Sequence, residues 1–265
     1  TERTVRWAEG TPGRTPLALV YLHGYSATRQ EIAPLPERVA AALGANLFYT
    51  RLTGHGRDAD AMLSGSVSAW QADAREALAI GRVIGERVVL VSTSTGGTLS
   101  TWLAAEQPGH ALAALVMISP NFAPRDRALY LFDTPLLAPL VLRWYRGEYR
   151  SWQPWNEQQA RYWTWRYPYA ALAELAKLMN AVERIDKSAI SVPTLMIYSP
   201  ADQVIDPDAV VEAFAQWGGT PKELHAFARA TDPAQHVLAG DVLSPGSTEE
   251  LAELIRAWLA RVLER

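Results

Sequence analysis

A serine, an aspartate and a histidine, the residue types of a serine nucleophile and the pair that can activate it, occur along this chain in the order Ser94, Asp202 and His236. A serine hydroxyl is too weakly acidic to attack a carbonyl carbon unaided, so a neutral imidazole must accept its proton. A carboxylate beside the imidazole fixes its tautomer and stabilises the imidazolium that forms. Each of the three lies just beyond the end of a predicted strand. We therefore expect Ser94 to be a nucleophile, His236 its base and Asp202 the partner of His236.

Ser94 lies in the segment 88–97. The segment begins with a run of apolar, mostly β-branched residues that predicts a strand, and this run ends at small residues. After them, apolar residues follow at helical spacing. Strand, sharp turn and helix are the context of a nucleophile elbow, with Ser94 at its apex. The turn is so tight that the residues two before and two after the nucleophile must be small. Gly96 meets this on one side, and Ser92 stands where the common motif has glycine. A serine-rich helix N-cap would explain the same residues without catalysis.

The first predicted buried strand, 17–22, ends directly in His23-Gly24-Tyr25. Catalysis by a serine needs backbone N–H groups aimed at the negative oxygen that develops during the reaction. Gly24 would let the backbone approach closely, and the Tyr25 N–H would be one donor. The Thr95 N–H, directly after Ser94, would be the other. A plain turn that ends the strand is the alternative interpretation of His23-Gly24.

Other residues compete for the same roles. Ser92 is a rival nucleophile, but it would still lie on the strand. Asp206 rivals Asp202, yet it precedes Pro207 and is typical of a helix start. His225 falls inside a predicted strand, from which its side chain would not easily reach the elbow. For two further residues we favour structural roles: His55, in the turn Thr53-Gly54-His55-Gly56, and Asp241, on the surface.

The composition excludes several classes of function. The chain has 265 residues, a net charge of -3 and no basic run, so nothing suggests nucleic-acid binding. It contains no cysteine, which excludes disulfides, thiol catalysis and cysteine metal sites, and we expect no metal. No stretch approaches the 18 or so apolar residues of a membrane span, and the N-terminal residues carry no signal-peptide core. We expect a cytoplasmic monomer or homodimer.

Strand and helix patterns alternate along most of the chain, which predicts an α/β fold with a mostly parallel sheet of about six to seven strands. The expected strands are 17–22, 45–50, 88–91, 112–118, 192–198 and 223–227, and the expected helices are 31–43, 67–84, 208–217, 248–263 and one after Ser94. Between residue 121 and residue 188 no strand-like run occurs. We expect a core domain of residues 1–120 and 189–265, with a helical cap of residues 121–188 inserted after the strand that ends near Ile118.

The predicted cap is rich in tryptophan and tyrosine. A cap over the carboxyl edge of an open α/β sheet lies where ligands bind, so its rings would form an apolar wall for a substrate. Packing of the cap onto the core would also use such rings, and we expect both roles. The rings that we expect to face a substrate are Trp152, Trp155, Trp163 and Trp165.

These motifs resemble the α/β-hydrolase superfamily, in particular its carboxylesterase and monoacylglycerol-lipase type. The resemblance spans nearly the whole chain and rests on segments 23–25, 53–56, 92–97, 199–205 and 235–238. It implies hydrolysis of short- and medium-chain carboxylic esters or monoacylglycerols without a cofactor. It also implies a triad of Ser94, Asp202 and His236, with Tyr25 and Thr95 as oxyanion donors. A lactonase, C–C hydrolase or perhydrolase is the alternative within the fold, and a ligand receptor on this scaffold is another.

Overall fold

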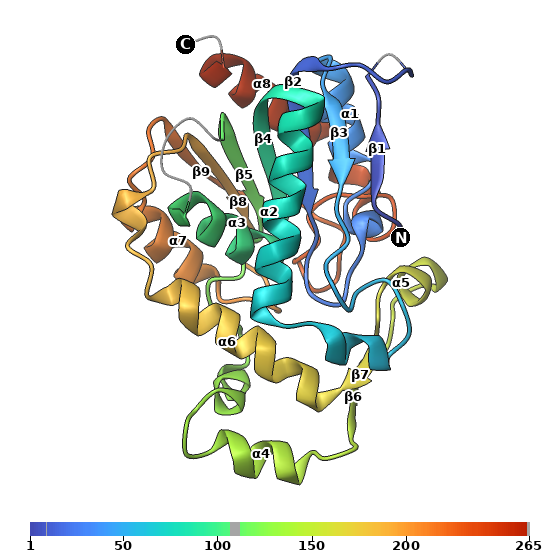
Figure 1. Cartoon of the computed structure of the whole chain (residues 1–265), viewed down its shortest axis with the longest axis vertical. Helices are drawn as coiled ribbons and strands as arrows, with labels where there is room; N and C mark the ends of the chain where they lie inside the picture. The colour runs from blue at the N-terminus through green and yellow to red at the C-terminus, as the bar shows by residue number, and fades with distance from the viewer. Residues whose placement is uncertain (9, 107–111, 264–265) are drawn as a thin grey trace.

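A seven-stranded sheet runs through the molecule, and helices cover both of its faces (Figure 1). The computed structural model describes residues 1–8, 10–106 and 112–263. The spatial order of the strands is β1-β3-β2-β4-β5-β8-β9, and β1 is antiparallel to β3 while the other pairs are parallel. Their bounds are β1 Thr4–Arg6, β2 Thr15–Leu22, β3 Asn46–Tyr49, β4 Gly85–Thr93, β5 Ala114–Ile118, β8 Thr194–Tyr198 and β9 Lys222–Ala226.

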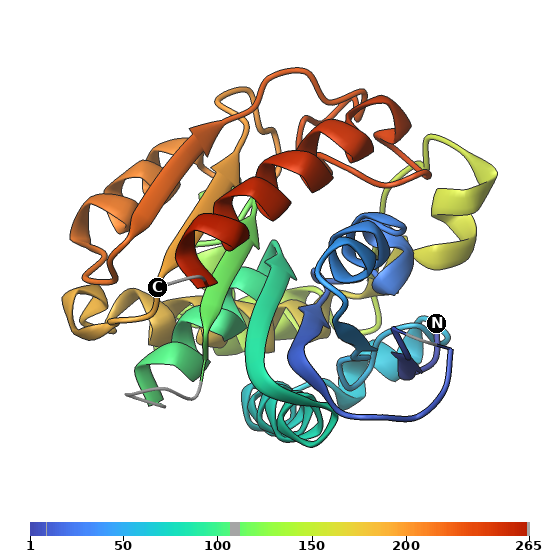
Figure 2. The ribbon, with the colours of Figure 1, turned by 90° about the horizontal axis from the view of Figure 1, so that it is seen from above.

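The central strand β4 shows why this sheet is buried on both faces. Val89 and Val91 point into one hydrophobic cluster, while Val88 and Leu90 point into the other. Helices α1 (Leu35–Ala42) and α8 (Thr248–Leu263) cover the first face. Helices α2 (Val67–Ile84), α3 (Thr95–Glu106) and α7 (Pro207–Gln216) cover the second. Figure 2 shows the sheet between these two layers.

The order of the strands creates the site at which a ligand can bind. From β2 the chain first builds β3 on one side, and it then crosses back to build β4 on the other side of β2. Loops after β2 and β4 therefore diverge at this point, where open α/β sheets bind their ligands. Gly24 follows β2 and Ser94 follows β4, and the two strands pair through Leu22 and Ser92.

The insertion between β5 and β8 holds most of the remaining elements. These are α4 (Ala138–Trp144), β6 (Tyr149–Ser151), α5 (Glu157–Tyr162), β7 (Arg166–Pro168) and α6 (Leu172–Glu183). In Figure 1, α4 lies at the end of the molecule away from the C-terminus. Leu172, Leu175 and Met179 of α6 belong to a separate hydrophobic cluster of this insertion, while Leu178 and Val182 pack into the sheet core. The division into core and cap stays a prediction.

Most of the expected elements are confirmed, and two expectations are wrong. The segment 121–188 contains an antiparallel two-stranded ribbon, β6 and β7, although no strand pattern was expected there. Strands of three residues are too short to show an alternation in the sequence. The helix expected over 31–43 begins only at Leu35, because a separate 3₁₀ helix at Arg29–Glu31 precedes it. Glu31 is the last residue of this 3₁₀ helix, and its side chain is buried.

A search of the helices within the described ranges finds none long and apolar enough to cross a membrane.

Candidate active site

Ser94 occupies a sharp turn between the end of β4 and the start of α3. Its φ angle is 53°, in the left-handed region that residues with a side chain rarely adopt. The turn is held by the neighbouring strand, since the Ser94 N–H donates to the Ile118 carbonyl at 3.0 Å and the Ser94 carbonyl accepts the Asn121 N–H at 3.0 Å. A strained backbone that several contacts hold in place is typical of a functional site.

The two positions that flank the nucleophile differ in how tightly they are packed. A Cβ on Gly96 would overlap with the Leu22 carbonyl, so only glycine fits there. Ser92 is fully buried on β4, and its Oγ lies 3.5 Å from the Val116 carbonyl. The structure thus accommodates serine where the common motif has glycine. Ser94, and not Ser92, lines the cavity described below.

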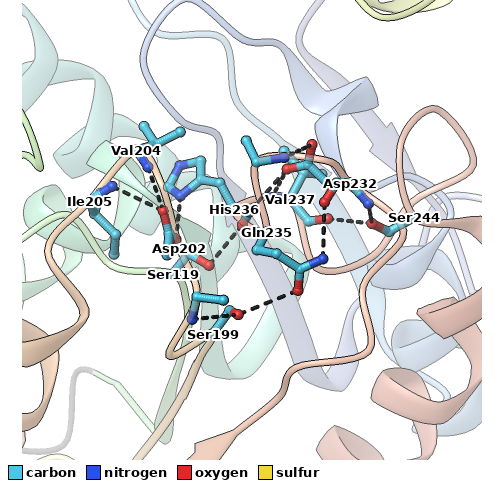
Figure 3. Close-up of polar contacts among 12 residues, drawn as sticks. Ser119, Ser199, Asp202, Val204, Ile205, Asp232, Gln235, His236, Val237 and Ser244 are labelled. Carbon is cyan, nitrogen blue, oxygen red and sulfur yellow. Dashed lines mark hydrogen bonds and ion pairs between the residues drawn. The ribbon is translucent and has the colours of Figure 1, made fainter.

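Asp202 and His236 form a buried pair (Figure 3). Asp202 follows β8, His236 lies in the loop after β9, and His236 Nδ1 is 2.8 Å from Asp202 Oδ2. The other oxygen of Asp202, Oδ1, accepts the Val204 N–H at 2.8 Å and the Ile205 N–H at 3.0 Å. These two backbone donors fix the orientation of the carboxylate. Asp202 therefore presents a fixed acceptor to the imidazole.

The charge around His236 favours its protonated form. Burial by itself lowers the pKa of His236, but the Asp202 carboxylate and its hydrogen bond, with smaller effects of Glu31 and Asp232, hold that pKa above its ordinary value. An imidazole with a raised pKa is a stronger base, and the imidazolium that would form during proton transfer is stabilised.

A third carboxylate, Asp232, holds the backbone of the histidine loop, and sequence analysis missed it. Asp232 Oδ2 accepts the His236 N–H at 3.0 Å and the Val237 N–H at 2.8 Å. Ser119 Oγ donates to the His236 carbonyl at 2.7 Å. Figure 3 shows these contacts around the loop. An Asp followed by Pro233, four residues before the expected base, is the sequence signal for such a turn.

Ser94 and His236 both line one cavity of about 310 Å³. Within the described part of the chain, no hydrogen bond joins Ser94 Oγ to the imidazole. Catalytic hydrogen bonds are often long in ligand-free structures and shorten when substrate binds. The arrangement therefore places the expected nucleophile and the expected base on the wall of one cavity.

The backbone N–H groups of Tyr25 and Thr95 are the expected oxyanion donors. Neither group donates a hydrogen bond to any residue that the structure describes. A Cβ on Gly24 would come within 3.0 Å of Ser94 Cβ, so glycine allows this loop to approach the nucleophile. His23 stabilises the loop: the Leu52 N–H donates to its Nε2 at 3.1 Å, which leaves Nδ1 as the donor to the Gly24 carbonyl at 2.9 Å.

Of the four tryptophans predicted to face a substrate, three line the cavity. Trp152, Trp155 and Trp163 line it, whereas Trp165 does not and is 38% exposed. Trp165 directly precedes β7, and its carbonyl accepts the Trp152 N–H at 3.1 Å. Arg150 and Tyr167, which pair within the ribbon, both line the cavity. The lining also includes polar residues from both the sheet loops and the insertion: Glu31, Asn121, Asp126, Arg150, Gln159 and Asp232.

The rival residues lie elsewhere. Asp206 caps α7, with its Oδ1 accepting the Asp208 N–H at 3.1 Å and its Oδ2 pairing with Arg127. His225 lies within β9, opposite Ile197. Asp241 is exposed on the surface.

His55 is buried under the oxyanion loop and does not line the cavity. Its ring lies 5.4 Å from the Tyr25 ring and 5.2 Å from the His23 ring, measured between centroids. Burial lowers the pKa of His55 to about 4 and that of His23 to about 3. Both imidazoles are therefore neutral at pH 7, consistent with structural roles.

Glu31 is the least expected residue of the cavity, because the sequence predicted it only as the first residue of a helix over 31–43. Its side chain is 2% exposed, and burial raises the pKa of its carboxyl group. No sequence signal marks it beyond its position eight residues after His23. Across the described ranges, no group of three or more His, Asp or Glu side chains is arranged to hold a metal ion.

Comparison with solved structures gives the same fold over nearly the whole chain. A structure of the metagenome-derived lipolytic enzymes LipS and LipT is 22% identical, with a TM-score of 0.79 over 98% of this chain and 97% of that one. The monoacylglycerol lipase of Paleococcus ferrophilus is 19% identical, with a TM-score of 0.70 over 98% of each chain. The monoglyceride lipase of Saccharomyces cerevisiae is 12% identical, with a TM-score of 0.72 over 98% and 91%.

A comparison with curated protein sequences finds no significant match. The family model described as "Serine aminopeptidase, S33" matches residues 14–231. That range contains most of the sheet, Ser94 and Asp202, and it stops five residues before His236. The chain therefore belongs to the serine aminopeptidase S33 family of α/β hydrolases.

Proposed function

We propose that this protein is a serine hydrolase that cleaves carboxylic esters through an acyl-enzyme intermediate. The observation that carries the proposal is the pair Asp202 and His236, joined at 2.8 Å, in the same cavity as a serine with a φ angle of 53°. The structural neighbours are lipases and monoacylglycerol lipases, which supports an ester as the substrate.

The chemistry follows from these positions. His236 Nε2 would accept the proton of Ser94 Oγ as that oxygen attacks the ester carbon. The N–H groups of Tyr25 and Thr95 would bind the oxygen that becomes negative. The imidazolium, held by Asp202, would then give its proton to the departing alcohol. Water, activated by the same imidazole, would release the acid and restore the serine.

The expected substrates are short- to medium-chain acyl esters or monoacylglycerols. The cavity of about 310 Å³ is of a size for a small ligand, and Trp152, Trp155 and Trp163 offer it apolar surface. No observation on the cavity favours a lactone, a carbon–carbon bond or a peroxide over an ester.

The test is hydrolysis of p-nitrophenyl esters of increasing acyl length by the wild type and by Ser94→Ala. We expect activity in the wild type and a loss on the order of 10⁶ in kcat in the variant, with the melting temperature kept. An amino-acid p-nitroanilide tests peptide-type substrates, which the name of the serine aminopeptidase family suggests.

Covalent labelling decides which serine reacts. A fluorophosphonate should label Ser94, and peptide mapping should find no label on Ser92, which lies on the strand and away from the cavity. A label on Ser92, or undiminished ester hydrolysis by Ser94→Ala, would contradict the proposal.

A further inference from the structure

A buried bridge of hydrogen bonds connects the loop after β2 with the residue before Ser94. The Gly24 N–H donates to Glu31 Oε2 at 2.8 Å. The Tyr21 hydroxyl lies 2.9 Å from the same oxygen and 3.0 Å from Thr93 Oγ1. Its single proton serves one of these contacts, and the Thr93 hydroxyl proton can serve the other. We call this chain, Gly24–Glu31–Tyr21–Thr93, the bridge.

The bridge connects the two segments that carry the expected oxyanion donors. Tyr25, with one N–H, directly follows Gly24, and Thr95, with the other, lies two residues after Thr93. The two segments follow different strands, so the distance between their N–H groups depends on contacts between the segments. Donors to an oxyanion must be held in place before the reaction, because reorganising them would cost the stabilisation that they provide.

Close packing places Glu31 next to the nucleophile. A Cβ on Gly24 would lie 2.6 Å from Glu31 Oε1 and 3.0 Å from Ser94 Cβ, so both groups touch the same face of this glycine. Glu31 also lines the cavity that holds Ser94 and His236. The carboxyl group is thus within the site itself.

Burial of the Glu31 carboxyl group costs the folded state free energy. A role in stabilising the fold alone is therefore a weak explanation for a glutamate at this position. Burial disfavours the ionised carboxyl group and raises its pKa. Over the described residues, no lysine or arginine forms an ion pair with Glu31. Its hydrogen bonds come from Gly24 and Tyr21, and an apolar residue at this position would leave the Gly24 N–H without its acceptor.

We propose that Glu31 is a positioning residue that keeps the N–H groups of Tyr25 and Thr95 aimed at one point, through Gly24 on one side and through Tyr21 and Thr93 on the other. The inference rests on the proposed ester hydrolysis. It predicts that damage to the bridge lowers the rate of the chemical step more than it weakens binding of the ester.

Four variants test the bridge. Glu31→Leu removes the acceptor at similar volume, Glu31→Gln keeps a carbonyl oxygen as an acceptor, and Tyr21→Phe removes only the middle hydroxyl. The matched control is Tyr49→Phe, since Tyr49 is equally buried, packs edge-on against Tyr21 at 5.8 Å and takes no part in the bridge. The readouts are kcat, KM, the melting temperature and the rate at which a fluorophosphonate labels Ser94.

We expect Glu31→Leu to lower kcat by about 10² to 10³, the loss that follows removal of one oxyanion donor, with KM changed by less than about threefold. Glu31→Gln should recover most of this loss, and Tyr21→Phe should lose about tenfold, an intermediate effect because it cuts only one side of the bridge. Tyr49→Phe should match the wild type. The rate of phosphonate labelling should fall in the same order, since that reaction uses the same N–H groups.

Three results would overturn the inference. Glu31→Leu and Tyr21→Phe with wild-type kcat would show that the bridge does not act on the reaction. Equal losses in Tyr21→Phe and Tyr49→Phe would show a general effect of buried hydroxyls. A Glu31→Gln variant as slow as Glu31→Leu would assign the effect to charge. If Glu31→Leu does not fold, Tyr21→Phe against Tyr49→Phe decides the question.

The proposed function is tested separately by the loss of activity in Ser94→Ala. Wild-type protein that hydrolyses no ester and takes no label would contradict the function, and this inference with it. Ester hydrolysis that depends on Ser94 but not on the bridge would contradict the inference alone.

Discussion

His236 Nδ1 lies 2.8 Å from Asp202 Oδ2, and the other oxygen of Asp202 is held by the N–H groups of Val204 and Ile205. Asp206 lies four residues further on. Its carboxylate accepts the Asp208 N–H at the start of α7 and forms an ion pair with Arg127. Two aspartates close in sequence therefore have separate tasks, and one faces the imidazole while the other caps a helix.

Asp202→Asn should lower kcat far more than Asp206→Asn. An amide beside Nδ1 favours the wrong tautomer of His236, which costs on the order of 10⁴ in kcat in a serine protease. Asp206→Asn keeps a capping side chain, and its effect on kcat should stay within about threefold because asparagine caps helices as well as aspartate does. Steady-state kinetics of both variants on one ester checks this, and equal losses would show that the acid is misplaced.

The pH dependence of activity should report His236. The groups that face its imidazole are the carboxyl groups of Asp202, Glu31 and Asp232, and their combined effect on the pKa of His236 exceeds the opposing effect of burial. The protonated imidazole is not a base, so kcat/KM should fall as the pH decreases through a raised pKa. We expect the acid limb of the profile of kcat/KM above about 6.5, the ordinary value for histidine. A limb at pH 5 or lower would contradict the assignment of His236 as the base.

Three tryptophans should separate substrate choice from stability. Trp155 is 62% exposed and lines the cavity, so Trp155→Ala should shift the preferred acyl length with little change in melting temperature. Trp163 is 8% exposed and packs into the core, so Trp163→Ala should cost about 3 to 5 kcal/mol of stability. Trp165→Ala is the matched control, because this exposed ring does not line the cavity.

The measurements for these variants are melting curves and kcat/KM across an ester series. Each CH₂ of an acyl chain that is buried against the rings should add up to about 0.8 kcal/mol, roughly fourfold in kcat/KM, until the cavity is full. A shift of the optimum by Trp165→Ala, or none by Trp155→Ala, would show that the substrate binds along a different wall.

The pair His23 and His55 should make the fold sensitive to acid. Burial lowers the pKa of His23 to about 3 and that of His55 to about 4, so both take up protons more readily when the chain is unfolded. Their contribution to stability is complete above about pH 6.5 and is lost as the pH falls. At pH 5 each imidazole should account for about 2 kcal/mol of lost stability.

Urea unfolding of wild type and His55→Phe at pH 7 and pH 5 measures this effect. The variant should lose about 2 kcal/mol less than the wild type between the two values, because one buried imidazole no longer titrates. Its stability at pH 7 serves as the reference for any packing change. Identical losses in the two proteins would contradict the neutral, buried state of His55.

Local patterns in the sequence were enough to predict the sheet, the helices around it and the order of the expected catalytic residues. Apolar runs with β-branched residues and helical spacing are local patterns, so β2, β4, α2 and α8 were found with nearly correct bounds. Ser94, Asp202 and His236 were predicted as a triad for the same reason, because each follows a predicted strand and residue type limits what each can do.

The residues that contact these expected catalytic residues from other parts of the chain became visible in the folded structure. Glu31 contacts Gly24 and, through Tyr21, Thr93, and no local pattern records a contact between segments 62 residues apart in sequence. Trp165 lies outside the cavity while Trp152, Trp155 and Trp163 line it, and this difference depends on how the insertion packs and not on its composition. The burial of the Glu31 carboxyl group beside Ser94 is likewise a result of packing. The sequence shows that residue 31 is a glutamate, and the folded structure shows which residues surround it.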